Sequence, residues 1–187
     1  MVVRRLLAAV LLLAAGWSIV SASDKGRFTG ELVVRMDDGG RKATLMQPFG
    51  YVDPEGRQWD VPANTIVDGA SIPRALWSIV GSPWTGLYRK ASVVHDYYCD
   101  TKDRGWRNVH KVFYDAMITE GMGIAEAKLM YGAVLYFGPK WKKELGLDGK
   151  VQLSTWQPQF DEAKFNQLRN WINTQNPSLD QIDALVQ

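Results

Sequence analysis

The sequence contains few cysteines and histidines, the residues that form disulfides and many metal centres. It contains one cysteine, Cys99, and two histidines, His95 and His110, among 187 residues. A single cysteine excludes an intrachain disulfide and a zinc site made of cysteines alone. Two histidines exclude a centre with three or more imidazole ligands. The rest of the composition, 46% hydrophobic and 22% charged, is typical of a globular chain, and the length predicts one main domain.

The N-terminal segment has the pattern of a secretory signal peptide. Arg4 and Arg5 form a short basic start, Leu6–Val20 is a mainly apolar run, and small residues follow at positions 21 and 22. The run is shorter than the roughly 20 residues that a membrane-spanning helix needs. We therefore expect residues 1–22 to direct export to the periplasm or the medium. The alternative is an uncleaved N-terminal anchor, in which case membrane contact occurs only through this segment.

No excess charge remains once residues 1–22 are set aside. That segment holds two basic residues and no acidic one, so the 22 basic residues of the chain fall to 20 and equal the 20 acidic residues. A balanced chain lacks the basic footprint of a nucleic-acid-binding protein, and we expect no nucleic-acid partner. We also expect the thiol of Cys99 to be buried, because it follows two tyrosines in a predicted helix.

Short strands are predicted between residues 28 and 67. Apolar or alternating runs at 32–36, 43–46, 49–52, 57–61 and 65–67 are separated by turn residues. The turn Asp53-Pro54-Glu55-Gly56 predicts a hairpin, because proline suits the second position of a turn and glycine the fourth.

Helical periodicity replaces this pattern after residue 70. We predict helices at 87–99, 107–117, 124–137 and 159–173, a short basic helix from Pro139 to Lys143, and a last helix that Asn176 and Pro177 begin. Strands followed by helices indicate an α+β fold: small antiparallel hairpins, then a helical bundle. We divide the chain into a single α+β domain at 23–146 and a C-terminal helical extension at 147–187.

The candidate chemistry centres on the helix that contains His95 and Asp96. His95 falls on the inner stripe of this helix, whereas Asp96 points about 100° away from it. His110 lies on the inner face of the next helix, and the short link between the two helices predicts an antiparallel hairpin. The two imidazoles should then lie at similar heights. They would form either a hydrogen-bonded pair or two ligands of one cation.

A second cluster, residues 68–73 (DGASIP), precedes the helices. Asp68 or Ser71 could cap a short helix that begins near Pro73, or Asp68 could contribute oxygen ligands to a site shared with Asp96. Aromatic residues gather around both clusters, among them Trp77 and Tyr98. Most of them should be core residues, but several lining one groove would suit a lipid chain or a sugar.

The motifs together resemble a known family. DGASIP at 68–73, His95-Asp96-Tyr97, Phe113 and Gly138 occur in the order seen in the bacterial and phage family called domain of unknown function 1353. The resemblance covers residues 30–142. It implies a compact domain in which the DGAS loop lies near the His-Asp helix, and it implies no defined activity.

The helix hairpin is also similar, more weakly, to the core of secreted phospholipase A2. That resemblance implies His95 as the general base for an attacking water and Asp96 as a calcium ligand. The position of the aspartate that orients the base is occupied here by His110, and the disulfides of that family are absent. A neutral histidine does not stabilise an imidazolium as a carboxylate does.

Two functions follow from these patterns. The first is an exported hydrolase of phospholipase or esterase type, with His95 and His110 as catalytic residues and a divalent cation, calcium or zinc, held by Asp96 and Asp68. The second is a non-catalytic binding or structural domain of the cell envelope or of a phage, in which the same residues form a buried polar network. A lipid or another envelope component is the expected partner in either case.

Overall fold

The computed structural model describes residues 25–40, 42–68, 84, 86–147 and 149–186. Three small antiparallel sheets and a set of helices make up this part of the chain, which confirms the predicted α+β class. Ser71, Trp77 and the predicted cap near Pro73 lie outside the described residues. Among the described residues, no helix combines the length and apolar character needed to cross a bilayer.

The first two sheets have three strands each. One sheet has the order β1-β4-β5, with strands Arg27–Thr29, Phe49–Val52 and Gln58–Val61. The other has the order β2-β3-β6, with strands Val34–Met36, Ala43–Leu45 and Ile66–Val67. Every pairing is antiparallel. These strands lie within or beside the predicted runs, so the expected hairpins are confirmed.

The turn between β4 and β5 is the one predicted from Asp53 and Gly56. The backbone N–H of Gly56 donates to the carbonyl of Asp53 at 2.9 Å, and Gly56 has a φ of 79°. The buried carboxylate of Asp53 also accepts the backbone N–H groups of Glu55 and Arg57 and the indole N–H of Trp59. Asp53 therefore holds this hairpin in register.

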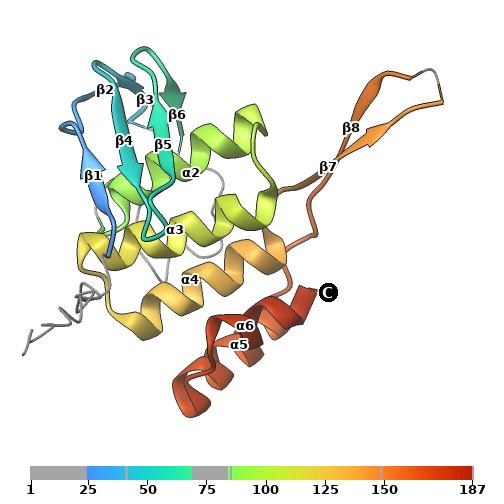
Figure 1. The fold of residues 1–187 in the computed structure, drawn as a ribbon. Helices are drawn as coiled ribbons and strands as arrows, with labels where there is room; N and C mark the ends of the chain where they lie inside the picture. Colours follow the sequence, from blue (N-terminus) through green and yellow to red (C-terminus); the bar gives the residue numbers. More distant parts are fainter. Residues whose placement is uncertain (1–24, 41, 69–83, 85, 148, 187) are drawn as a thin grey trace, which may run out of the picture.

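The helices form successive layers beneath the sheets (Figure 1). They are α2 (Arg89–Thr101), α3 (Trp106–Glu120), α4 (Ile124–Phe137), α5 (Glu162–Gln175) and α6 (Leu179–Asp183), followed by the 3-10 turn η2 (Ala184–Val186). The pair α2 and α3 lies against the sheets, α4 packs on α3, and α5 and α6 pack on α4. A left-handed residue, Lys102, ends α2, and the chain turns back into α3 within a few residues. The antiparallel helix hairpin is therefore confirmed.

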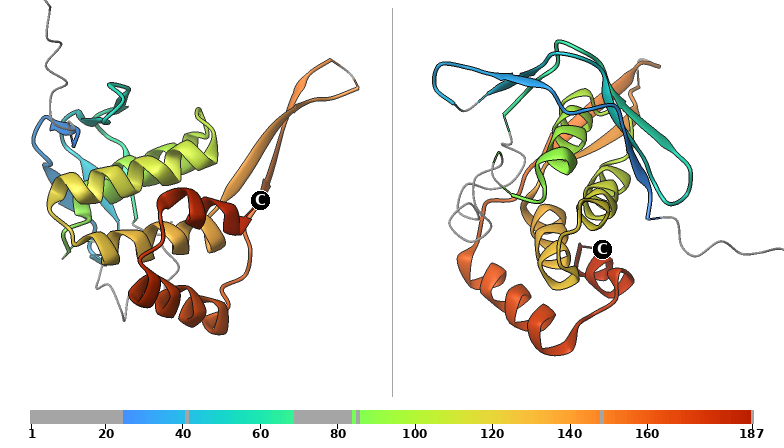
Figure 2. Two further views of the ribbon diagram at one scale, coloured as in Figure 1. Left: turned by 60° about the horizontal axis from the view of Figure 1, so that its bottom comes forward. Right: turned by 90° about the vertical axis from the view of Figure 1, so that its left-hand side faces the viewer.

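The predicted helix from Pro139 to Lys143 is wrong. Residues Lys140–Leu145 form strand β7, which pairs with β8 (Val151–Trp156) in a hairpin that projects from the body (Figures 1 and 2). Gly149 has a φ of 73° and its N–H donates to the carbonyl of Gly146, which closes the hairpin turn. The partner strand supplies backbone hydrogen bonds that five residues of isolated helix could not offer.

The C-terminal extension packs against the domain through α4. Phe165, Leu168, Ile172 and Ile182 are buried in the same hydrophobic core as the residues of α4. Asn176 does not begin the last helix as predicted. It ends α5 in the left-handed conformation, with a φ of 44°, and Ser178 caps α6 instead. Ser178 forms a capping box with Gln181, and this reciprocal pair satisfies two backbone donors that one asparagine could not.

Candidate functional site

The two histidines meet in the middle of the helix hairpin. His95 lies on the face of α2 that contacts α3, and His110 lies on the facing side of α3. Nε2 of His95 lies 2.8 Å from Nδ1 of His110, and both side chains are fully buried. The hydrogen-bonded pair, one of the two arrangements expected from the sequence, is thus present.

One arrangement of protons fits the contacts of this pair. Nε2 of His110 lies 3.2 Å from the carbonyl oxygen of Pro139, which can only accept a hydrogen bond. Nε2 of His110 therefore carries a proton and donates to Pro139. In a neutral ring this leaves Nδ1 as the acceptor, so Nε2–H of His95 donates to it.

Burial holds both rings in the neutral form. Desolvation lowers the pKa of His95 from 6.5 to about 3. It also lowers the pKa of His110 well below its usual value, and the proximity of His95, Lys140 and Arg107 lowers it further. No carboxylate belongs to the cluster that His95 and His110 form among the described residues. The pair is therefore a neutral donor–acceptor unit at physiological pH.

Cys99 completes the cluster, and its role was not predicted. Sγ of Cys99 lies 3.6 Å from Nε2 and 3.9 Å from Nδ1 of His95, and Cys99 is buried as expected. The ligand atoms of His95, Cys99 and His110 all lie within 4.8 Å of one another. His95 and Cys99 are four residues apart on one helix, which places them on the same face. This spacing was the signal in the sequence that could have identified the cluster.

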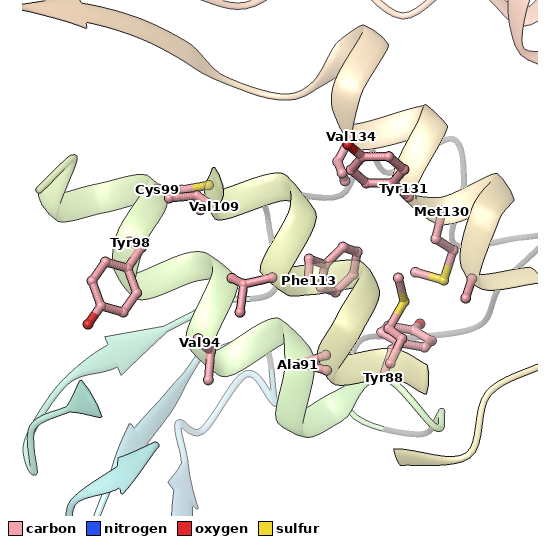
Figure 3. Close-up of a cluster of buried hydrophobic side chains, with 14 of the residues drawn as sticks. Tyr88, Ala91, Val94, Tyr98, Cys99, Val109, Phe113, Met130, Tyr131 and Val134 are labelled. Atoms are coloured by element: carbon pink, nitrogen blue, oxygen red, sulfur yellow. The ribbon is translucent and has the colours of Figure 1, made fainter. Parts of the chain in front are cut away.

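Aromatic rings enclose the cluster. Phe113 lies against His95 with 4.7 Å between ring centroids, and Trp106 makes an edge contact with His110 at 5.6 Å. Trp141 also makes an edge contact with His110, with 6.5 Å between ring centroids. Figure 3 shows Phe113 and Cys99 at the contact between α2 and α3. The walls are thus apolar, which strengthens any electrostatic interaction inside.

The other predicted site residues lie elsewhere. Asp96 is buried, and Asp68 is exposed at the end of β6. Neither belongs to the histidine cluster of the described residues. Partial desolvation and the negative charge of Asp68 raise the pKa of Asp100, so Asp68 lies near the C-terminal end of α2. A shared cation site of Asp96 and Asp68 stays a prediction.

Tyr98 faces away from the histidines. Its hydroxyl donates to the carbonyl of Asp60 at 3.2 Å, and its ring meets the edge of Trp59 with 5.0 Å between centroids. Figure 3 shows the ring turned towards the strands. The guanidinium of Arg104 lies over both rings, 4.2 Å from the centroid of Trp59. Tyr98 therefore joins α2 to the first sheet. A binding role for it stays a prediction.

Comparison with known proteins identifies a family without a described activity. Residues 43–134 match the family described as "Protein of unknown function (DUF1353)". Two uncharacterized proteins of Sinorhizobium fredii (strain NBRC 101917 / NGR234) are similar to this chain. The protein y4jT is 40% identical over 152 residues, which are 80% of this chain and 45% of that protein. The protein y4iH is 40% identical over 145 residues, which are 71% of this chain and 61% of that protein.

The chain therefore spans only part of these relatives, between 45% and 61% of their length. Among the solved structures, none matches this chain. Any function has to be argued from the geometry of the site itself.

Proposed function

The chain belongs, over residues 43–134, to the DUF1353 family, and we propose that it is an exported, non-catalytic binding or structural domain of the cell envelope. In this proposal the His95–His110 pair joins α2 to α3 and fixes how the helix hairpin packs. The observation that carries it is the complete burial of both imidazoles, which donate and accept within the protein.

The electrostatics of the pair support this proposal. A general base works best when its pKa lies near the operating pH. Burial lowers the pKa of His95 to about 3, so its ring is a weak base at neutral pH. His110 is neutral as well and cannot stabilise an imidazolium as a carboxylate would.

The test is the substitution His95→Asn. We expect the wild-type protein to hydrolyse neither phospholipids nor simple esters, with or without calcium. We expect the variant to have a clearly lower melting temperature, because a buried group loses its hydrogen-bond partner. Asp100→Asn is the control, since Asp100 is exposed on the same helix. Ester hydrolysis that disappears in the His95 variant at an unchanged melting temperature would contradict the proposal.

An exported hydrolase is the second candidate, and one observation favours it. Nε2 of His95 is paired with the residue at position 110, which is the position of the base-orienting residue in the phospholipase resemblance. In this candidate His95 would act as the base, with Asp96 and Asp68 as cation ligands. The same hydrolysis assay, with Asp96→Asn and Asp68→Asn added, distinguishes the two.

Export is part of both candidates and rests on residues 1–22. Fractionation of the producing cells tests it, followed by N-terminal sequencing of the protein. We expect a periplasmic or secreted chain that begins at Ser23. A cytoplasmic chain that retains its first residues would contradict export.

A further inference from the structure

We propose that His95, Cys99 and His110 form a three-ligand site for a soft monovalent cation, Cu(I). This inference rests on the proposed function, because it gives the bound metal a structural and not a catalytic role. The cluster offers two imidazole nitrogens and one sulfur from two adjacent helices. Thiolate and imidazole ligands select soft and borderline metals and disfavour calcium, whose ligands are oxygens.

The three donor atoms lie within 4.8 Å of one another, so modest side-chain movements bring them within reach of one metal ion. With metal–ligand bonds of about 2.0–2.3 Å, donor atoms at 120° to each other lie about 3.5–3.8 Å apart. Sγ of Cys99 lies 3.6 Å from Nε2 of His95 and 3.9 Å from Nδ1, so it sits beside the ring, and the cysteine side chain must rotate towards the Nε2 lone pair to share a metal with it. The 2.8 Å contact between His95 and His110 must open by about 0.7 Å. Removal of the shared proton drives this opening, because two lone pairs then face each other.

His110 is already oriented as a ligand. Its Nε2–H donates to the carbonyl of Pro139, which fixes the tautomer and directs the lone pair of Nδ1 into the cluster. Histidines that bind metals characteristically use their second nitrogen in this way. Gly138 brings the chain close enough for this contact, since a β-carbon at Gly138 would lie only 3.2 Å from Cε1 of His110.

The net charge of the metal with its ligands distinguishes Cu(I) from Zn(II) at this site. The surroundings are apolar, and an uncompensated charge is costly to bury there. Cu(I) bound to one thiolate and two neutral imidazoles is a centre of zero net charge. Zn(II) with the same ligands keeps one positive charge and calls for a fourth, anionic ligand, and no carboxylate joins the cluster in the described part of the chain.

The binding step balances as follows. The thiol of Cys99 loses its proton to solvent and its sulfur bonds to Cu(I). The proton on Nε2 of His95 is replaced by one on Nδ1 of the same ring, so that Nε2 becomes a ligand. Nδ1 of His110 keeps its lone pair and becomes the third ligand. One proton is therefore released for each Cu(I) bound, and no electron is transferred.

The experiment is a titration of the purified, reduced, full mature chain with Cu(I) in the absence of oxygen. A chromophoric Cu(I) chelator serves as the competitor. We expect one Cu(I) per chain, release of one proton in an unbuffered titration, a thiolate-to-copper absorption band and a higher melting temperature. Cys99→Ser should weaken binding by about a hundredfold or more while the chain stays folded, since even partners of metal ligands contribute about 10–100-fold.

Matched variants separate the site from the surrounding core. Met117→Leu alters a buried residue of α3 outside the cluster and should bind Cu(I) like the wild type. Cys99→Ala provides a second variant in case serine perturbs the fold. Unchanged Cu(I) affinity in either cysteine variant would overturn the proposal, as would binding without proton release. One-to-one Zn(II) binding by a chain that does not take up Cu(I) would overturn the assignment of the metal.

This outcome is distinguishable from failure of the proposed function. Metal binding is measured by stoichiometry and proton release, whereas the non-catalytic role is tested by hydrolysis. A chain that hydrolyses esters and also binds Cu(I) would overturn only the non-catalytic role, and a chain that neither hydrolyses esters nor binds Cu(I) would overturn only the metal site.

Discussion

Nε2 of His95 and Nδ1 of His110 lie 2.8 Å apart, and this contact joins the middle of α2 to the first half of α3. Both rings are neutral because burial lowers both pKa values. Either ring can be protonated only by placing a charge in the apolar core. The stability of the domain is therefore tied to pH through these two residues.

The first prediction concerns stability in mild acid. Above about pH 6.5 both histidines are neutral in the folded and the unfolded chain, so their contribution to stability is constant. Below pH 6.5 the unfolded chain binds protons that the folded chain does not bind until about pH 3 at His95. The free energy of unfolding should fall over this window by about 1.4 kcal/mol per pH unit for each histidine. Urea denaturation at several pH values measures it.

The substitution His95→Asn provides the control for this prediction. It removes one of the two titrating groups. Below pH 6.5 the slope of the unfolding free energy against pH should therefore decrease by about 1.4 kcal/mol per pH unit, which corresponds to one proton. The absolute stability will also fall, and for that reason the slope is the quantity to compare. An unchanged slope in the variant would show that other groups cause the acid sensitivity.

The second prediction concerns Gly138, which ends α4 beside the cluster. A β-carbon at this position would lie 2.3 Å from the carbonyl oxygen of Val134, which is backbone and cannot easily move. Gly138→Ala should cost about 1–3 kcal/mol, as overpacking of a core does. Gly123→Ala is the matched control, because a β-carbon there meets nothing within 4 Å. Thermal unfolding of both variants measures the difference. Equal melting temperatures would contradict the close approach.

The third prediction concerns Asp53. Its carboxylate accepts hydrogen bonds from Arg57 and Trp59, including Nε of Arg57 at 2.6 Å and the indole N–H at 2.9 Å. Desolvation alone would raise the pKa of Asp53, but these donors outweigh it and the pKa is lowered. Asp53→Asn should cost about 1.5–3 kcal/mol at neutral pH, because an amide N–H would face another donor.

Asp60→Asn is the control for Asp53. Asp60 is exposed, and its carboxylate accepts a hydrogen bond from the side-chain amide of Gln58. Its substitution should change stability by less than about 0.5 kcal/mol. The difference between the two variants should shrink as the pH falls through the pKa of Asp53, since the folded carboxylate loses its charge there. A constant difference down to strong acid would count against the role of the charge.

Local patterns in the sequence were sufficient for the helix hairpin and the β4–β5 turn. The spacing of apolar residues identified α2 and α3, and the short link between them placed His95 opposite His110. The strand β7 could not be found in this way, because its stability depends on a partner strand later in the chain. Cys99 was predicted as a buried residue; its spacing from His95 places both on one helix face, but the contact of its sulfur with the imidazole is seen only in the structure. Burial depends on all the surrounding elements, so a single helix pattern could not show that both imidazoles are sealed.

The fourth prediction concerns the C-terminal extension and its attachment to α4. Ile182 of α6 is fully buried, and Gly132 of α4 lets it approach closely: a β-carbon at Gly132 would lie 3.5 Å from Ile182 and 2.9 Å from Leu168. Ile182→Ala should cost about 2–5 kcal/mol. Leu147→Ala is the control, since Leu147 is fully exposed near the tip of the β7–β8 hairpin.

Urea unfolding followed by tryptophan fluorescence and by circular dichroism measures the effect. If α5 and α6 fold together with the domain, both signals should show one coincident transition, and its midpoint should be lower in Ile182→Ala than in the wild type. Two separate transitions, with only the first shifted by Ile182→Ala, would instead show that the extension is an independent unit docked on α4.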